Sequence, residues 1–125
     1  MASNKSLRKM TATASFVQAT DASSGTGAKT ISDTMSIPIG ATVTACITVP
    51  SVSSNSSGNS ETATITVGGI DVSAAHNQAA MAAGNVVTDV TGGVTTDGTA
   101  IGITVGGEAF TAGSMDIIIE YYLLD

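Results

Sequence analysis

Alternation of apolar and polar residues is the feature of this sequence that most restricts its fold. The clearest run covers Ala41–Val52, where Ala, Val and Ile hold every second position up to Val49 and Thr or Cys lie between them. Side chains of a β-strand point alternately to the two faces of a sheet, so this run predicts a strand with one buried face. Pro50 suits an edge or a bulge, because proline donates no ladder hydrogen bond.

Similar alternation recurs in short runs separated by turns rich in Gly and Ser. Strands are expected at Thr11–Thr20, Thr30–Ile37, Ala41–Val52, Thr62–Val67, Val86–Val90, Ala100–Val105 and Ser114–Leu124. Residues 73–83 are rich in alanine and precede Gly84, so a short helix or an ordered loop is expected there. Seven or eight short strands in 125 residues indicate an all-β fold, an antiparallel β-sandwich of jelly-roll-like type.

Length and composition predict one domain with few reactive side chains. A single β-sandwich is expected over residues 12–125, preceded by a flexible basic arm at residues 1–11. Charged residues make up 11% of the chain, and His76 and Cys46 are the only residues of their kinds, so His and Cys cannot supply a zinc site. No apolar run approaches the roughly 20 residues of a membrane-spanning helix. We expect no metal, no cofactor and no membrane insertion, with Cys46 as a small packing residue.

Patterns that resemble catalytic or nucleotide-binding motifs are incomplete in this chain. Residues 23–30, SSGTGAKT, resemble a phosphate-binding loop, but Ser23 and Ala28 stand where that motif needs glycine. Asp116 and Glu120 share one face of the last predicted strand, where they lie about 13 Å apart, too far for the carboxylate pair of a glycosidase. We therefore expect that the protein is not an enzyme.

Charge is divided unevenly along the chain. Residues 1–20 contain Lys5, Arg8 and Lys9 and no acid, whereas residues 21–125 contain all ten acids and one lysine. The formal charges are +3 and −9, which sum to −6. An acidic body does not suit nucleic-acid binding, which needs clustered Lys and Arg. The three basic residues either form a solvated, frayed terminus or dock on an acidic partner.

The last predicted strand, Ser114–Leu124, is partly apolar on both faces. Such a strand is either central in a sheet or part of an interface. A core built mainly from Val, Ile and Ala is also thin, because each small side chain buries little apolar surface. These two observations predict a homo-oligomer, with Ile118, Tyr122 and Leu124 as candidate interface residues.

Two segments resemble a known group of proteins. Residues 37–41, IPIGA, open a long strand, and residues 112–122, AGSMDIIIEYY, close the chain, with Val-Gly-Gly turns between them. Over about residues 30–124 the sequence is similar to small virion proteins of tailed bacteriophages with jelly-roll domains. This group includes capsid decoration (cement) proteins and fibre domains, and the resemblance implies no catalytic residues.

For a decoration protein, the resemblance implies a small homo-oligomer, a trimer, that stabilises the phage head by binding the outer surface of the major capsid protein lattice. Lys5, Arg8 and Lys9 are then candidate capsid contacts. The alternative is a head or tail fibre or receptor-binding knob, whose loops at 51–60 and 89–98 would contact the host. The absence of a secretory signal predicts synthesis in the host cytoplasm before assembly into the virion.

Overall fold

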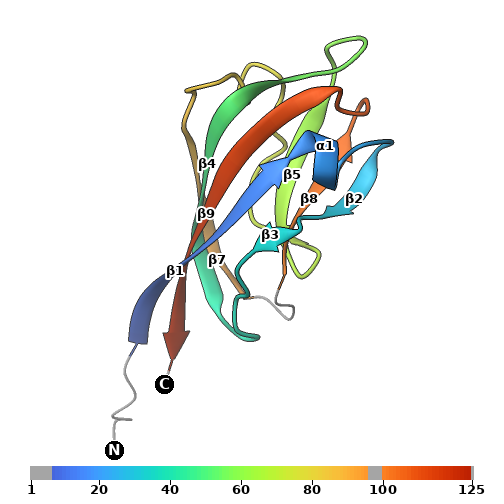
Figure 1. The fold of residues 1–125 in the computed structure, drawn as a ribbon. Helices are drawn as coiled ribbons and strands as arrows, with labels where there is room; N and C mark the ends of the chain where they lie inside the picture. Colours follow the sequence, from blue (N-terminus) through green and yellow to red (C-terminus); the bar gives the residue numbers. More distant parts are fainter. Residues whose placement is uncertain (1–6, 96–99, 125) are drawn as a thin grey trace, which may run out of the picture.

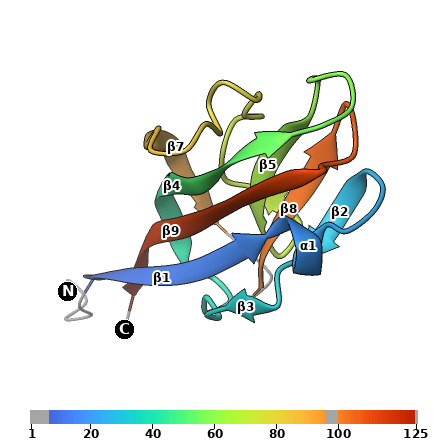
Figure 2. The ribbon, with the colours of Figure 1, turned by 45° about the horizontal axis from the view of Figure 1, so that its top comes forward.

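Two antiparallel sheets packed face to face form the molecule in this computed structural model, which describes residues 7–95 and 100–124 (Figures 1 and 2). The elements are β1 (Leu7–Val17), α1 (Gln18–Asp21), β2 (Gly27–Thr30), β3 (Asp33–Thr34), β4 (Thr42–Asn55), β5 (Thr62–Val67), β6 (Ile70–Asp71), β7 (Val87–Thr95), β8 (Ile101–Gly106) and β9 (Ala112–Leu124). The predicted all-β, antiparallel sandwich is confirmed.

The chain pairs as one long hairpin wound into two layers. Strands β1, β2, β4 and β5 pair with β9, β8, β7 and β6 respectively. Pairing of β4 with β9 and of β5 with β8 then joins these ribbons. The result is a large sheet of order β3-β1-β9-β4-β7 and a small sheet of order β2-β8-β5-β6. The first and last strands therefore lie side by side in the large sheet.

The core lies between the sheets and consists mainly of alternate residues of β1, β5, β8 and β9, together with residues of β4. In β9 the inward residues include Ile117 and Ile119, which are fully buried. Phe16 of β1 and Phe110 meet edge to face with ring centroids 5.8 Å apart, a geometry worth about 0.5–1.5 kcal/mol beyond the area that the rings bury. The few aromatic residues thus join the ends of β1 and the loop before β9.

A bulge in β4 changes which side chains of that strand reach the core. The pairing register shifts between Val43 and Ala45, and one extra residue in a strand reverses the faces of the side chains that follow it. Cys46 and Thr48 are therefore fully buried, while Ile47 faces outward and is half-buried. The uniform alternation expected from the sequence is wrong beyond this bulge.

Two segments lie outside the regular alternation. Residues 73–83 form an ordered loop, one of the two expected alternatives, and the short helix within the described residues, α1, follows β1. Of the arm expected at residues 1–11, residues 1–6 lie outside the described part, and residues 7–11 belong to β1 and pair with the end of β9. Their sequence has no clear apolar face, so the strand there follows from the long partner strand rather than from burial.

Candidate interaction surface

The first part of β1 and the last part of β9 lie at one end of the large sheet, and their tips extend beyond the rest of the sandwich (Figure 1). We call residues 7–11 and 120–124, which pair with one another, the terminal ribbon; residues 120–122 also pair with the start of β4. All five residues on its β1 side are exposed, among them Leu7 at 62%. A large apolar side chain with this exposure on a paired strand is suited to contact another molecule.

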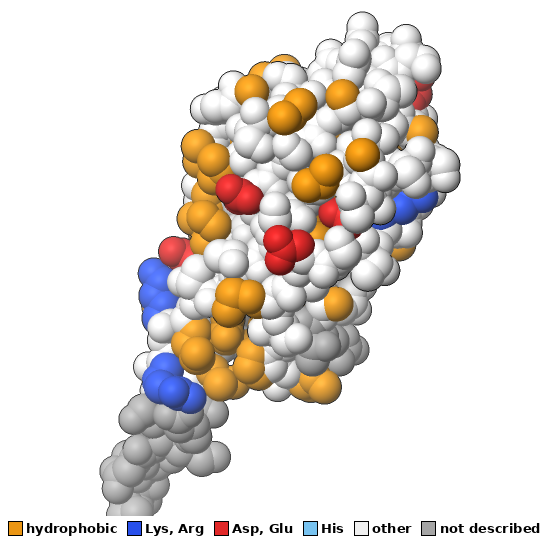
Figure 3. All heavy atoms as spheres, viewed as in Figure 1, with side chains coloured by type: hydrophobic (Ala, Val, Ile, Leu, Met, Phe, Trp, Pro, Cys, Tyr) orange, Lys and Arg blue, Asp and Glu red, His pale blue; other side chains and the backbone are white. Residues whose placement is uncertain are grey.

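Positive charge is concentrated on this ribbon. Arg8 and Lys9 are both exposed there, and Figure 3 shows Lys and Arg side chains gathered at this end with Asp and Glu higher on the same face. Lys9 Nζ lies 3.7 Å from the carboxylate of Glu120, an exposed pair worth at most about 1 kcal/mol. Lys5 lies outside the described residues, and Lys29 of β2 donates to the Ser24 carbonyl at 2.7 Å, away from the ribbon.

The candidate interface residues of β9 lie on the outer face of the large sheet. Ile118 is half-buried and lies opposite Ile47 of β4 on one side and Thr13 of β1 on the other. Tyr122 lies four residues further along the same face and is also half-buried. The backbone of Leu124 pairs with Leu7, and its side chain lies outside the described residues.

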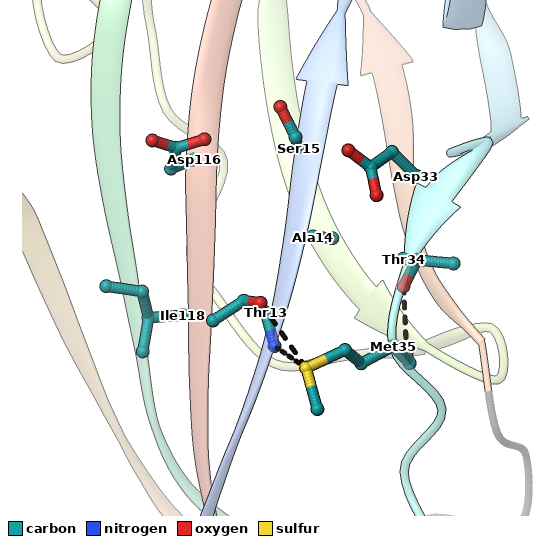
Figure 4. Close-up of a pocket in the computed structure, with 8 residues that line it drawn as sticks. All are labelled: Thr13, Ala14, Ser15, Asp33, Thr34, Met35, Asp116 and Ile118. Carbon is teal, nitrogen blue, oxygen red and sulfur yellow. Dashed lines mark hydrogen bonds between the residues drawn. The ribbon is translucent and has the colours of Figure 1, made fainter.

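A shallow, open depression of about 390 Å³ lies on this outer face between β3, β1 and β9 (Figure 4). Thr13, Met35 and Ile118 line one end of it, and Asp33 and Asp116 lie at the other end. The Met35 sulfur is 3.4 Å from both the backbone nitrogen and the hydroxyl of Thr13. The lining residues include no Lys or Arg, so the depression carries negative charge next to a small apolar surface.

A buried polar cluster joins β4 to β7 through the histidine. His76 is 5% exposed, and its Nε2 donates to the Asp89 carboxylate at 2.6 Å, since an ionised carboxylate can only accept. Its Nδ1 lies 3.5 Å from the Thr48 hydroxyl. The order of groups resembles a hydrolase triad, but Thr48 is 0% exposed, so no substrate carbonyl can reach its oxygen. The cluster satisfies buried polar groups and stabilises the sandwich.

Cys46 lies in the core and is chemically unreactive in the folded state. Burial, and then the negative charge of Asp89, raise the pKa of its thiol to about 12. The thiolate is the nucleophilic form of cysteine, and almost none exists at neutral pH under these conditions. The structure therefore assigns Cys46 a packing position.

A second polar cluster, which the sequence analysis missed, surrounds Glu61. This side chain is fully buried and accepts hydrogen bonds from the hydroxyls of Ser54 at 2.8 Å and Ser56 at 2.7 Å. Burial raises the pKa of the carboxyl, but hydrogen bonds from Ser56, Ser54, its own backbone and Gln78 together hold the pKa below its ordinary value. The run of serines before Glu61 was the available signal, because those hydroxyls can satisfy a carboxylate.

Glu108 holds the loop that precedes β5. Its carboxylate accepts from the backbone nitrogens of Gly58 at 2.8 Å and Ser60 at 3.0 Å. Hydrogen bonds, first from the Ser60 hydroxyl and then from the Ser60 backbone, hold the pKa of this carboxyl below its ordinary value. Of residues 51–60, considered above as a loop that contacts the host, residues 51–55 belong to β4, and the loop that follows them is attached to the body by specific bonds.

Residues 7–95 and 100–124 contain neither a cluster suited to a metal ion nor a membrane-spanning helix. No three His, Cys, Asp or Glu side chains lie close enough together there to hold a metal ion. None of the helices described is long and apolar enough to span a membrane.

Comparisons with known proteins place the fold. No family model and no curated protein matches the chain. A chain in the acidic stable capsid structure of Helicobacter pylori bacteriophage KHP30 is similar, with a TM-score of 0.61 and 12% identity, covering 97% of this chain and 96% of that one. A chain in the cyanophage Pam1 capsid asymmetric unit has a TM-score of 0.56 and 20% identity, covering 95% and 86%. At these identities the likeness establishes a shared fold.

Proposed function

We propose that this protein is a structural component of a bacteriophage virion, specifically a capsid decoration (cement) protein on the outer surface of the major capsid protein lattice. The observation that carries the proposal is the fold match to a chain of a phage capsid structure over nearly the whole of both chains, 97% and 96%. Equal coverage means that the two chains have nearly equal lengths. A chain of this size is suited to attach to a shell as a small added subunit.

The strand pairing supports a virion role. One long hairpin, with halves β1-β2-β4-β5 and β6-β7-β8-β9, is wound into two facing sheets, and this pairing supports the proposal of a jelly-roll domain. Jelly rolls are common among viral capsid domains. The fully buried Thr48 beside His76 supports the further proposal that the protein is not an enzyme.

In this proposal the basic end of the molecule contacts the lattice. Arg8 and Lys9 on the terminal ribbon, together with Lys5, attract acidic groups of the capsid protein. Each exposed ion pair is weak, so we propose a homotrimer in which three ribbons bind together. Ile118, Tyr122 and Leu124 remain the proposed interface residues between copies. The protein acts in the virion after synthesis in the host cytoplasm, without nucleic-acid or membrane partners.

Binding to emptied, expanded capsid shells tests the proposal. Wild-type protein should sediment with the shells in a saturable manner, and added salt should weaken binding because exposed charges are screened. The double variant Arg8→Gln/Lys9→Gln should bind at least tenfold more weakly and respond less to salt, because each of the three ribbons loses two ion pairs of up to about 1 kcal/mol each. Lys29→Gln, on the other sheet, is the matched control and should bind normally. Binding to host cells without binding to shells would instead support the fibre or receptor-binding knob.

A further inference from the structure

The terminal ribbon has one open sheet edge. In a strand, the N–H and C=O of one residue point to the same side, and successive residues alternate. Met35 donates to the Thr13 carbonyl at 2.9 Å, and the Thr13 nitrogen faces the Met35 sulfur, so Thr13 points away from β9. The pairing of β1 with β9 is continuous from Leu7 to Val17. Leu7, Lys9 and Thr11 therefore also direct their backbone groups away from β9.

These outward groups have no backbone partner within the part of the chain that the structure describes. β3 lies on that side, but it pairs with β1 only at Ala14 and Ser15 (Figure 2). Leu7, Lys9 and Thr11 thus leave three N–H and three C=O groups open along about 13 Å of strand. An edge of this length can accept an added strand through main-chain hydrogen bonds.

We propose that an extended, acidic segment of the capsid protein adds to this edge as a further strand of the large sheet. The inference rests on the proposed function and adds the binding mode. Charge complementarity favours an acidic strand, because Arg8 and Lys9 flank the open groups and outnumber the one acid of the terminal ribbon, Glu120, which lies 3.7 Å from Lys9 Nζ. The exposed Leu7 offers an apolar contact to the same strand.

A second copy of this chain fits the edge poorly. Two such edges related by a two-fold axis at Lys9 would place the two Lys9 side chains opposite each other, and like charges at that position are unfavourable. Lysine on an edge strand commonly prevents pairing between identical edges. The same lysine favours an acidic strand, so one residue both disfavours self-pairing and selects the partner.

The edge is also ordered before the partner arrives. Pairing of Leu7–Thr11 with Glu120–Leu124 already holds the backbone of β1 in an extended conformation. Only the incoming segment then loses conformational freedom on binding, which reduces the entropic cost. This is the advantage of a ribbon over a flexible arm as a docking surface.

Replacement of Thr11 by proline tests the proposal. The Thr11 N–H faces away from β9, so Thr11→Pro removes an open donor and leaves the β1–β9 hydrogen bonds in place. We expect its affinity for emptied, expanded shells to fall at least tenfold. Thr11→Val keeps the N–H and a β-branched side chain, and should bind within twofold of wild type. Circular dichroism and the melting temperature show whether each variant is folded.

Hydrogen exchange of the wild-type protein provides a test that needs no variant. The amides of Lys9 and Thr11 should exchange rapidly in the free protein and at least tenfold more slowly on shells. Equal shell binding by wild type and Thr11→Pro, or unprotected amides on shells, overturns the edge proposal while the decoration role stands. Absence of wild-type binding overturns the proposed function itself. If Thr11→Pro changes the oligomeric state of the protein in the absence of shells but leaves shell binding unchanged, the edge pairs with a second copy of this chain, and the proposal is overturned.

Discussion

Removal of the buried carboxylate at Glu61 should destabilise the fold strongly. In Glu61→Ala the Ser54 hydroxyl, which is 4% exposed, loses its acceptor, whereas the Ser56 hydroxyl loses one bond and keeps the Glu108 carboxylate at 3.2 Å. One buried hydroxyl without a partner, at roughly 1–3 kcal/mol, and one lost hydrogen bond, at about 0.5–1.5 kcal/mol, give a loss of about 1.5–4.5 kcal/mol in the free energy of unfolding. That loss is a large fraction of the stability of a typical domain, about 5–15 kcal/mol.

The same residue should make stability depend on pH. The pKa of Glu61 is lower in the folded protein than its ordinary value of 4.5, so the unfolded chain binds more protons as the solution becomes acidic. Its contribution to stability is complete above pH 4.5 and is lost as the pH falls through the lower folded pKa. Glu61→Gln keeps one acceptor oxygen but does not titrate, so it should lack this part of the acid dependence.

Urea denaturation followed by circular dichroism, at neutral pH and in steps below pH 4.5, measures both effects. Glu120→Gln is the matched control, because it removes a half-exposed carboxylate paired with Lys9 and should cost at most about 1 kcal/mol. The reasoning fails if Glu61→Ala costs no more than this control. It also fails if Glu61→Gln and wild type lose stability in parallel on acidification.

Two further predictions concern the core and one turn. Because burial raises the pKa of the Cys46 thiol to about 12, a thiol reagent should modify this residue only as fast as the protein unfolds. Rapid modification of the folded protein would contradict the packing position of Cys46. Gly107 has a φ of +72°, and a Cβ there would overlap the Ser60 carbonyl oxygen. At Gly69 φ is +85° and the space around a Cβ is open. Gly107→Ala should therefore lower the melting temperature more than Gly69→Ala does. Equal melting temperatures for the two variants would contradict the predicted overlap.

Alternation in the sequence predicted the fold class because period-two burial depends only on local geometry. The inward residues of β9, such as Ile117 and Ile119, follow it directly. The pattern failed in β4, where the bulge after Val43 exchanged the faces of Cys46 and Ile47. No composition signal marks that bulge, since Thr, Ala and Cys fit either face of a strand.

The long-range partners within the polar clusters were beyond sequence reasoning for a different reason. His76 and Asp89 are separated by 13 residues, and their contact depends on the bridge between His76 and Ala63 of β5 and on where β7 lies next to β4. Glu61 and Glu108 likewise bind one loop from two different strand ends. Side-chain pairs of this kind follow from the three-dimensional order of strands, which short-range periodicity does not contain.

Stability and binding are supported by separate parts of this molecule. No residue of β1 before Ala12 is buried, so the ribbon residues 7–11 contribute little to the core. Residues whose substitution should lower the free energy of unfolding most, such as Glu61, lie in the body of the sandwich, and their hydrogen bonds do not involve the terminal ribbon. Lys9→Gln and Thr11→Pro should therefore weaken binding without altering the melting temperature. Changes at Glu61 should lower the melting temperature while shell affinity, measured where the variant is folded, stays constant.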